Sequence, residues 1–231
     1  MEENLLKNFK RFAYTYKTSL LLKDMGLNLN ETTSREKGLE VLKLMAFIAV
    51  KYRSPLIKKG APLTAEEVFS MIPFAEKKFM EENGDFARAQ VSCKSGCGAC
   101  CNLRVSMSDE EVPALEKYIK DNNIQFSKER MEKQKSVSSA QWYTKLKREE
   151  RTCPFLDKET QSCKVYEARP ASCRLQFVAT PAEDCEKIDK NNGVGQVMYL
   201  HLPEAEILMS LALMLSSSEE KNIASAMSHL L

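Results

Sequence analysis

The stretch Cys93-Lys-Ser-Gly-Cys97-Gly-Ala-Cys100-Cys101 holds four cysteines within nine residues, and two of them are adjacent. Four further cysteines follow, at Cys153, Cys163, Cys173 and Cys185. The first 92 residues contain no cysteine. Thiolates are soft anionic ligands that suit zinc, iron and iron–sulfur clusters. The pattern therefore predicts a metal ion or cluster as the partner, with all eight cysteines as candidate ligands.

Four disulfides are the alternative use of an even number of cysteines. Disulfide scaffolds are usually small secreted domains that lack a sufficient core, whereas this chain has 231 residues, of which 43% are hydrophobic. Lys7, Lys10 and Arg11 interrupt the N-terminus, so it has no apolar run typical of a secretion signal. We therefore expect a cytoplasmic protein with reduced thiols.

The charge balance gives no electrostatic reason to expect nucleic acid or an anionic membrane as the main partner. Lys and Arg number 34 and Asp and Glu 32, for a net charge of +2. The locally basic stretch 127–151 also carries glutamates, which indicates a solvated helix surface. The uncharged apolar stretch 207–218 is shorter than the roughly 20 residues that span a bilayer.

Apolar periodicity and capping signals predict a mostly α-helical fold. Helices are expected over 2–25, 34–52, 64–83, 108–122 and 204–216, followed by a terminal helix. Ala46 is expected on the buried face of the second helix, and capping boxes are expected at Thr64 with Glu67 and at Ser108 with Glu111. Residues 152–200 are interrupted by prolines and should be irregular, with short strands at 175–178 and 194–200. The expected organisation is a helical N-terminal region (1–88), a metal-stabilised cysteine domain (89–200), and C-terminal helices packed on the core (201–231).

The cysteine spacing constrains how metals could be held. A Cys-x2-Cys turn such as Cys97 to Cys100 presents two sulfurs to one metal, and Cys93 adds a third. Adjacent side chains should point apart, so either Cys100 and Cys101 serve different metals or one is not a ligand. Eight thiolates allow two four-thiolate sites, or one cluster with a second ion. Arg169 and Arg174 flank Cys173 and either offset the charge of such a site or are ordinary surface arginines.

These elements together resemble the YkgJ-like cysteine-cluster family, whose members are described as zinc- or iron-chelating. The resemblance rests on Cys93-x3-Cys97-x2-Cys100-Cys101, on Cys153-Pro-Phe-Leu, and on Cys163-x-Val-Tyr-Glu-x-Arg-Pro-x-x-Cys173-Arg174. It covers about residues 91–190, and Cys185 falls beyond its strongest motif. The cysteine region is also similar to that of flagellin lysine methylases, which use S-adenosylmethionine. The resemblance implies metal chelation through the cluster cysteines.

Three functions remain open from the sequence. The first is a metal-binding protein with a structural, carrier or redox role, holding zinc, iron or an iron–sulfur cluster. The second is a cluster-dependent enzyme, because Cys93-x3-Cys97-x2-Cys100 has the cysteine spacing of radical S-adenosylmethionine enzymes; no catalytic residue is identified, although His201 could act as a base or ligand. The third is a metal-clamped module that binds a protein partner. A pocket beside Cys100 and Cys101 would favour the enzyme, and exposed apolar surface on 2–25 or 204–231 would favour the module.

Overall fold

The structure, a computed structural model, describes residues 35–53, 62–93, 96–191, 195–218 and 220–231. The chain divides into two compact units, one formed by Met1–Glu82 with Leu202–Ser217 and the other by Asn83–His201 with Ser218–Leu231. The helix expected over 2–25 lies outside the described residues.

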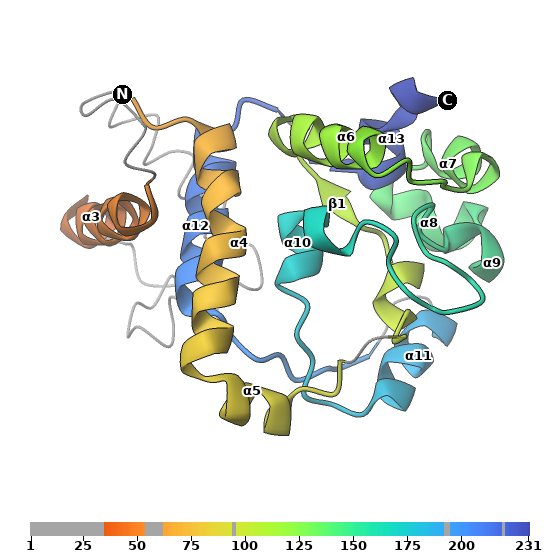
Figure 1. The fold of residues 1–231 in the computed structure, drawn as a ribbon, viewed down its shortest axis with the longest axis horizontal. Helices are drawn as coiled ribbons and strands as arrows, with labels where there is room; N and C mark the ends of the chain where they lie inside the picture. The colour runs from red at the N-terminus through yellow and green to blue at the C-terminus, as the bar shows by residue number, and fades with distance from the viewer. Residues whose placement is uncertain (1–34, 54–61, 94–95, 192–194, 219) are drawn as a thin grey trace. The chain divides into compact units, whose positions relative to one another are not determined.

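The described residues of the first unit contain the helices α3 (Arg35–Tyr52), α4 (Ala65–Glu82) and α12 (Pro203–Leu215). Figure 1 shows α12 running alongside α4, and the two helices are in contact along their length. Their shared core consists of buried apolar side chains, among them Val68, Ile72, Ala205, Leu208 and Ala212. The helix α12 is apolar nearly all round, which is typical of a helix that packs centrally rather than at a surface.

Two local details of this unit differ from the sequence expectation. Ala46 was expected on the buried face of its helix, but it is exposed, and Ile48 is buried beside Met45 and Ala49 instead. The capping box expected at Thr64 and Glu67 is half formed. The Glu67 N–H donates to Thr64 Oγ1 at 3.2 Å. The Glu67 carboxylate accepts a 2.6 Å hydrogen bond from Arg53 Nε, because an ion pair competes with the box for that carboxylate.

The second unit consists of short helices and turns around one apolar core. Its α-helices are α5 (Gly84–Gln90), α6 (Val112–Asp121), α7 (Lys128–Gln134), α8 (Trp142–Lys145), α9 (Arg148–Arg151), α10 (Ala171–Arg174), α11 (Ala182–Lys190) and α13 (Ile223–Ala226). Its 3₁₀ turns are η1 (Ala99–Asn102), η2 (Asp109–Glu111), η3 (Ser139–Gln141), η4 (Tyr166–Ala168) and η5 (Ser228–Leu230). The core contains Met107, Leu115, Met131, Phe155 and Met227, with Cys153 among them.

The only sheet among the described residues pairs β1 (Ser106–Met107) with β2 (Lys221–Asn222) in antiparallel register. The strands expected at 175–178 and 194–200 are reduced to one antiparallel bridge between Val178 and Tyr199. The predicted mostly α fold is confirmed. The predicted domain boundaries and the metal stabilisation remain predictions. Within the described part of the chain, no helix has the length and apolarity needed to cross a membrane.

Candidate metal centre

A cavity of about 640 Å³ in the second unit brings most of the cysteines together. Six of the eight contribute to its wall, namely Cys97, Cys100, Cys101, Cys153, Cys163 and Cys173. They come from segments up to 76 residues apart in the sequence (173 − 97). The fold of this unit therefore collects thiols that the sequence spreads over three separate motifs.

The first motif approaches the cavity through a tight turn. Gly96 has a φ of +81°, a left-handed conformation that L side chains rarely adopt. Gly98 packs so closely that an added Cβ would lie 2.7 Å from Gln161 Oε1 and 3.1 Å from a methyl group of Leu156. The loop that follows Cys153 thus lies directly against the turn, and the helical turn η1 then presents Cys100 and Cys101.

We expect Gly96→Ala to lower the free energy of unfolding by about 1–2 kcal/mol, because alanine pays the steric cost of the left-handed conformation. Space is not the obstacle, since an added Cβ would meet only the Thr160 carbonyl oxygen at an ordinary 3.5 Å. Urea unfolding measures the change. Gly96→Asn is the matched control, because asparagine tolerates left-handed backbone, and it should retain most of the stability. Equal losses in both variants would contradict the backbone explanation.

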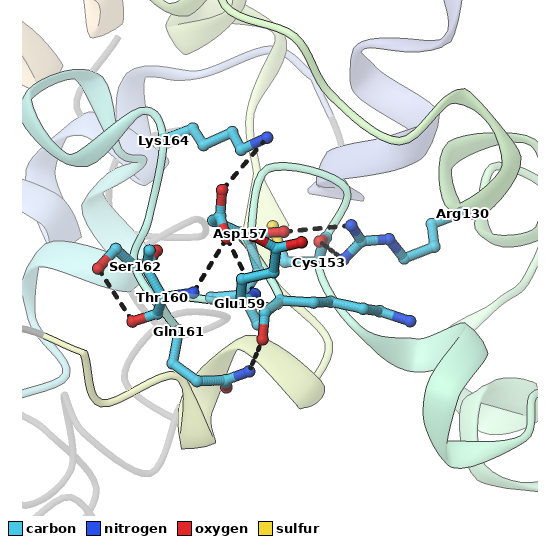
Figure 2. Close-up of polar contacts among 10 residues, drawn as sticks. Arg130, Cys153, Asp157, Glu159, Thr160, Gln161, Ser162 and Lys164 are labelled. Carbon is cyan, nitrogen blue, oxygen red and sulfur yellow. Dashed lines mark hydrogen bonds and ion pairs between the residues drawn. The ribbon is translucent and has the colours of Figure 1, made fainter.

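The second motif is a closed loop between Cys153 and Cys163 (Figure 2). Leu156 and Cys163 form an antiparallel bridge, and the Lys164 N–H donates to the Phe155 carbonyl at 3.0 Å. Asp157 Oδ1 accepts hydrogen bonds from the N–H groups of Glu159 at 2.9 Å and Thr160 at 3.1 Å. These bonds hold the pKa of Asp157 below its usual value, so the carboxylate stays charged and fixes the turn. The loop fixes the separation between its two cysteines.

Arg130 on α7 holds the same loop by two hydrogen bonds, as Figure 2 shows. Its Nη1 donates to the Cys153 carbonyl at 2.8 Å and its Nη2 to the Leu156 carbonyl at 3.1 Å. Hydrogen bonds from a charged donor to half-buried carbonyls are among the stronger ones in proteins. Arg130 therefore fixes the backbone of a candidate ligand without contacting the cavity.

Replacing Arg130 by Ala should destabilise the protein by about 2–3 kcal/mol, because two charge-assisted hydrogen bonds to the loop disappear. Lys128→Ala on the exposed side of the same helix is the matched control and should change stability by less than about 0.5 kcal/mol. Thermal unfolding followed by circular dichroism measures both. An Arg130→Ala protein as stable as the control would show that the loop does not depend on these hydrogen bonds.

Cys173 lies on the short helix α10, which is held at its start by Glu111. The Ala171 N–H donates to Glu111 Oε1 at 2.8 Å, while the second carboxylate oxygen accepts from the Ser108 N–H at 3.1 Å. This is the capping box predicted at Ser108 and Glu111, and the structure confirms it. One carboxylate thus caps the entrance to α6 and also holds the helix that carries Cys173.

The two expected arginines have different surroundings. Arg169 contributes to the cavity wall, and its guanidinium lies 4.0 Å above the Tyr166 ring. Arg174 is buried, is not among the residues of that wall, and donates to the carbonyls of Arg169 and Glu167. Arg174 therefore supports the backbone of Arg169, and Arg169 is the arginine that faces the thiols.

Cys93 and Cys185 lie beside the cavity rather than in its wall. Cys93 Sγ accepts from the Val178 N–H at 3.4 Å and donates to the Gln176 carbonyl at 3.5 Å. Cys185 is carried by α11, which packs against η1. Burial raises the pKa of the Cys185 thiol, and the neighbouring thiols of Cys93, Cys97 and Cys100 raise it further. Cys93, Cys97 and Cys100 are therefore close enough to Cys185 for their charges to affect its pKa.

The remaining cysteines form a second set of neighbours. Burial raises the pKa of the Cys153 thiol to about 12, and Cys163 adds to that rise. Burial also raises the pKa of Cys173, with Cys153, Cys100 and Cys163 acting in the same direction. Cys101 belongs here because Cys153 and Cys173 both raise the pKa of its thiol, after the larger effects of Cys100 and burial. In addition, the Cys153 N–H donates to the Cys101 carbonyl at 2.7 Å.

Cys100 and Cys101 join the two sets. A hydrogen bond between the two thiols lowers the pKa of Cys100 to about 7, and Arg169 acts in the same direction. The same contact raises the pKa of Cys101. The two thiols therefore lie close together on one 3₁₀ turn. The expectation that they serve different metals, or that one of them is not a ligand, stays a prediction. A thiolate is the form that binds metals, so Cys100 is the thiol most ready to do so.

The donor chemistry fits a soft metal, since the cavity wall contains thiols and no carboxylate. The described residues nevertheless hold no group of three or more His, Cys, Asp or Glu already arranged around one point suitable for an ion. A cysteine needs only a rotation about its Cα–Cβ bond to redirect its sulfur. Binding a metal at this site thus requires the thiols to turn inward from a backbone that already places them together.

The residues matched by a known family coincide with this region. Residues 92–194 match the CxxCxxCC family, described as "Putative zinc- or iron-chelating domain". This match confirms the resemblance expected from the cysteine motifs, and it indicates zinc or iron chelation for the CxxCxxCC region. Cys97, Cys100 and Cys101 follow the spacing in the family name. Cys93 departs from it, because three residues rather than two separate it from Cys97. No curated protein and no solved structure shows a significant match to the chain.

Sequence reasoning missed four residues that build or line the site: Arg104, Glu111 as a support of α10, Arg130 and Gln161. Arg130 was assigned to a solvated basic surface, because its charge alone does not reveal which carbonyls it contacts. His201 and His229 do not contribute to the cavity wall, and His229 lies 3.5 Å from Glu116 instead.

Proposed function

We propose that the protein binds two zinc or iron ions, or an iron–sulfur cluster with one further ion, through all eight cysteines. The outer group consists of Cys93, Cys97, Cys100 and Cys185. The inner group consists of Cys101, Cys153, Cys163 and Cys173. Each group supplies four thiolates, the number found in structural zinc sites and in cysteine-ligated clusters.

The observation that carries this proposal is the cavity whose wall brings six of the eight cysteines together from three separate motifs. The division into two groups follows the influence of the thiols on one another: Cys185 is affected by the other three members of the outer group, and in the inner group Cys173 is affected by Cys153 and Cys163, and Cys101 by Cys153 and Cys173. Cys100 also acts on Cys153, Cys163 and Cys173, so it lies close to both groups. Placing Cys100 and Cys101 in different groups gives each adjacent cysteine its own metal, which puts the two metals side by side.

Charge supports the same arrangement. A four-thiolate site with a divalent ion carries a net charge of about −2. Arg169 lowers the pKa of Cys93 in the outer group and of Cys163 and Cys173 in the inner group, although burial is the larger influence on each thiol. One guanidinium close to both groups can offset part of the charge of both metals.

The test is anaerobic purification followed by an absorption spectrum and elemental analysis for zinc, iron and acid-labile sulfide. About two zinc ions per chain in a colourless protein, or iron with matching sulfide, would agree with the proposal. A protein that contains neither metal after anaerobic purification, and takes up neither when supplied with it, would contradict the proposal.

An enzyme remains the second candidate, and the cavity beside Cys100 and Cys101 is the observation that favours it. Metal sites that only stabilise a fold are closed, whereas catalytic sites keep room for a substrate. For the protein-interaction module, Phe47, Val50 and Phe74 on α3 and α4 are exposed, whereas within described residues 204–231 Leu231 is the only large hydrophobic residue that is exposed. The segment 2–25 lies outside the described residues.

A further inference from the structure

The cavity is much larger than metal ions require. Its volume is about 640 Å³, whereas a water molecule in the liquid occupies roughly 30 Å³. Pockets for small organic molecules in proteins run from about 300 to 1,000 Å³. Even with metals bound along the thiol wall, most of this space remains for a second occupant.

The part of the wall that is not made of thiols has an apolar portion and a polar portion. Apolar and aromatic side chains come from Leu103, Val105, Val165, Tyr166, Pro170, Tyr199 and Ile223, and uncharged polar side chains come from Ser106, Gln161, Ser162, Ser172 and Gln176. The charged side chains in the wall are Arg104 and Arg169, both cationic. An occupant suited to these surfaces has an apolar body and a negative charge.

Arg104 is the cation that needs an acceptor. Its Nη1 donates to Ser106 Oγ at 2.8 Å, while its Nε is buried and has no hydrogen-bond partner. Glu220 acts on Arg104 through space, but it forms no ion pair with it and lies outside the cavity wall. A half-buried guanidinium with an unmatched donor is costly unless an anion pairs with it. Arg169 is stacked on the Tyr166 ring at 4.0 Å, and its charge already acts on Cys100, Cys163 and Cys173. We therefore assign the ligand to Arg104.

We propose that this cavity binds a small organic monocarboxylate, with its carboxylate on Arg104 and its apolar body along the apolar part of the wall. The proposal rests on the proposed function in one respect, namely that metals occupy the thiol side. A single carboxylate fits better than a dianionic phosphate ester, because one guanidinium under the influence of Glu220 supplies no more than one positive charge. Its planar oxygens also match the guanidinium fork.

The test uses the full-length metal-loaded protein and a series of probes: butanoate, hexanoate, octanoate and benzoate. Hexanamide and hexanol are the uncharged controls. Isothermal titration measures binding, and the metal content of every sample is determined in parallel. Arg104→Gln removes the charge, Arg104→Lys retains it, and Arg148→Gln is the matched control on an exposed arginine outside the cavity.

We expect binding that strengthens with chain length, is weakened about tenfold or more by Arg104→Gln, is partly restored by Arg104→Lys, and is unchanged by Arg148→Gln. Equal binding of the uncharged controls, an unaffected Arg104→Gln protein, stronger binding of phosphate esters, or no binding at millimolar concentration would each overturn the proposal. A protein without metal would contradict the proposed function separately, because carboxylate binding and metal content are measured independently.

Discussion

Cys173→Ser should reduce the metal content from about two ions per chain to about one and destabilise the protein by more than about 4 kcal/mol. Cys173 belongs to the inner group. Another member of that group, Cys153, lies within the apolar core of the second unit. A serine hydroxyl is a poorer and harder ligand than a thiolate for zinc or iron. Loss of the inner metal also removes the metal–thiolate bonds that join three distant segments of the chain. The free energy of metal binding then no longer stabilises the folded domain.

Cys185→Ser is the matched variant for the outer group. It should also leave about one metal per chain, but with a smaller loss of stability, because Cys173 contributes to the cavity wall whereas no residue of α11 does. Elemental analysis and thermal unfolding of both proteins, with the double variant, complete the comparison. The double variant should retain essentially no metal. If either single variant kept the full metal content, the assignment of that cysteine as a ligand would be wrong.

Removing the metal with a chelator should unfold much of residues 152–191 while leaving the helices of the first unit intact. The cysteine region has short helices and loops, and Cys153, Cys163 and Cys173 from it contribute to the cavity wall. In contrast, α4 and α12 bury a continuous apolar core that includes no cysteine. Segments that rely on metal–thiolate bonds lose their constraint when the metal leaves.

Hydrogen–deuterium exchange of the metal-loaded and chelated protein measures this effect. Peptides that cover Cys153 to Cys173 should exchange at least about tenfold faster after chelation, whereas those of α4 and α12 should change little. Re-addition of zinc or iron under anaerobic conditions should restore protection. Unchanged exchange across the cysteine region after complete metal removal would show that the apolar core alone maintains it.

The class of fold and the location of the site could be predicted from local patterns. The helices α4 and α12 begin and end within two residues of the expected bounds, because apolar periodicity and capping residues are local signals. The cysteine motifs also identified the region later matched to a zinc- or iron-chelating family. Both kinds of signal depend on residues that are close together in the sequence.

The rest depends on contacts between distant residues, which the sequence does not display. Nothing in the sequence places Arg130 on the carbonyls of Cys153 and Leu156, or Glu111 on the first turn of α10. The closeness of the thiols of Cys100 and Cys101 depends on a single 3₁₀ turn, a local backbone conformation that the cysteine spacing does not reveal. Arg104 could be recognised only once its surroundings were known.

Native mass spectrometry of the anaerobically purified protein, followed by alkylation of its free thiols, tests whether all eight cysteines hold metal. We expect a mass increase equal to about two metal ions or a cluster with one ion, and no thiol available to the alkylating reagent until a chelator is added. After chelation, all eight cysteines should react. Bound metal accompanied by four or more freely reactive thiols, or no bound metal at all, would contradict the two-group arrangement.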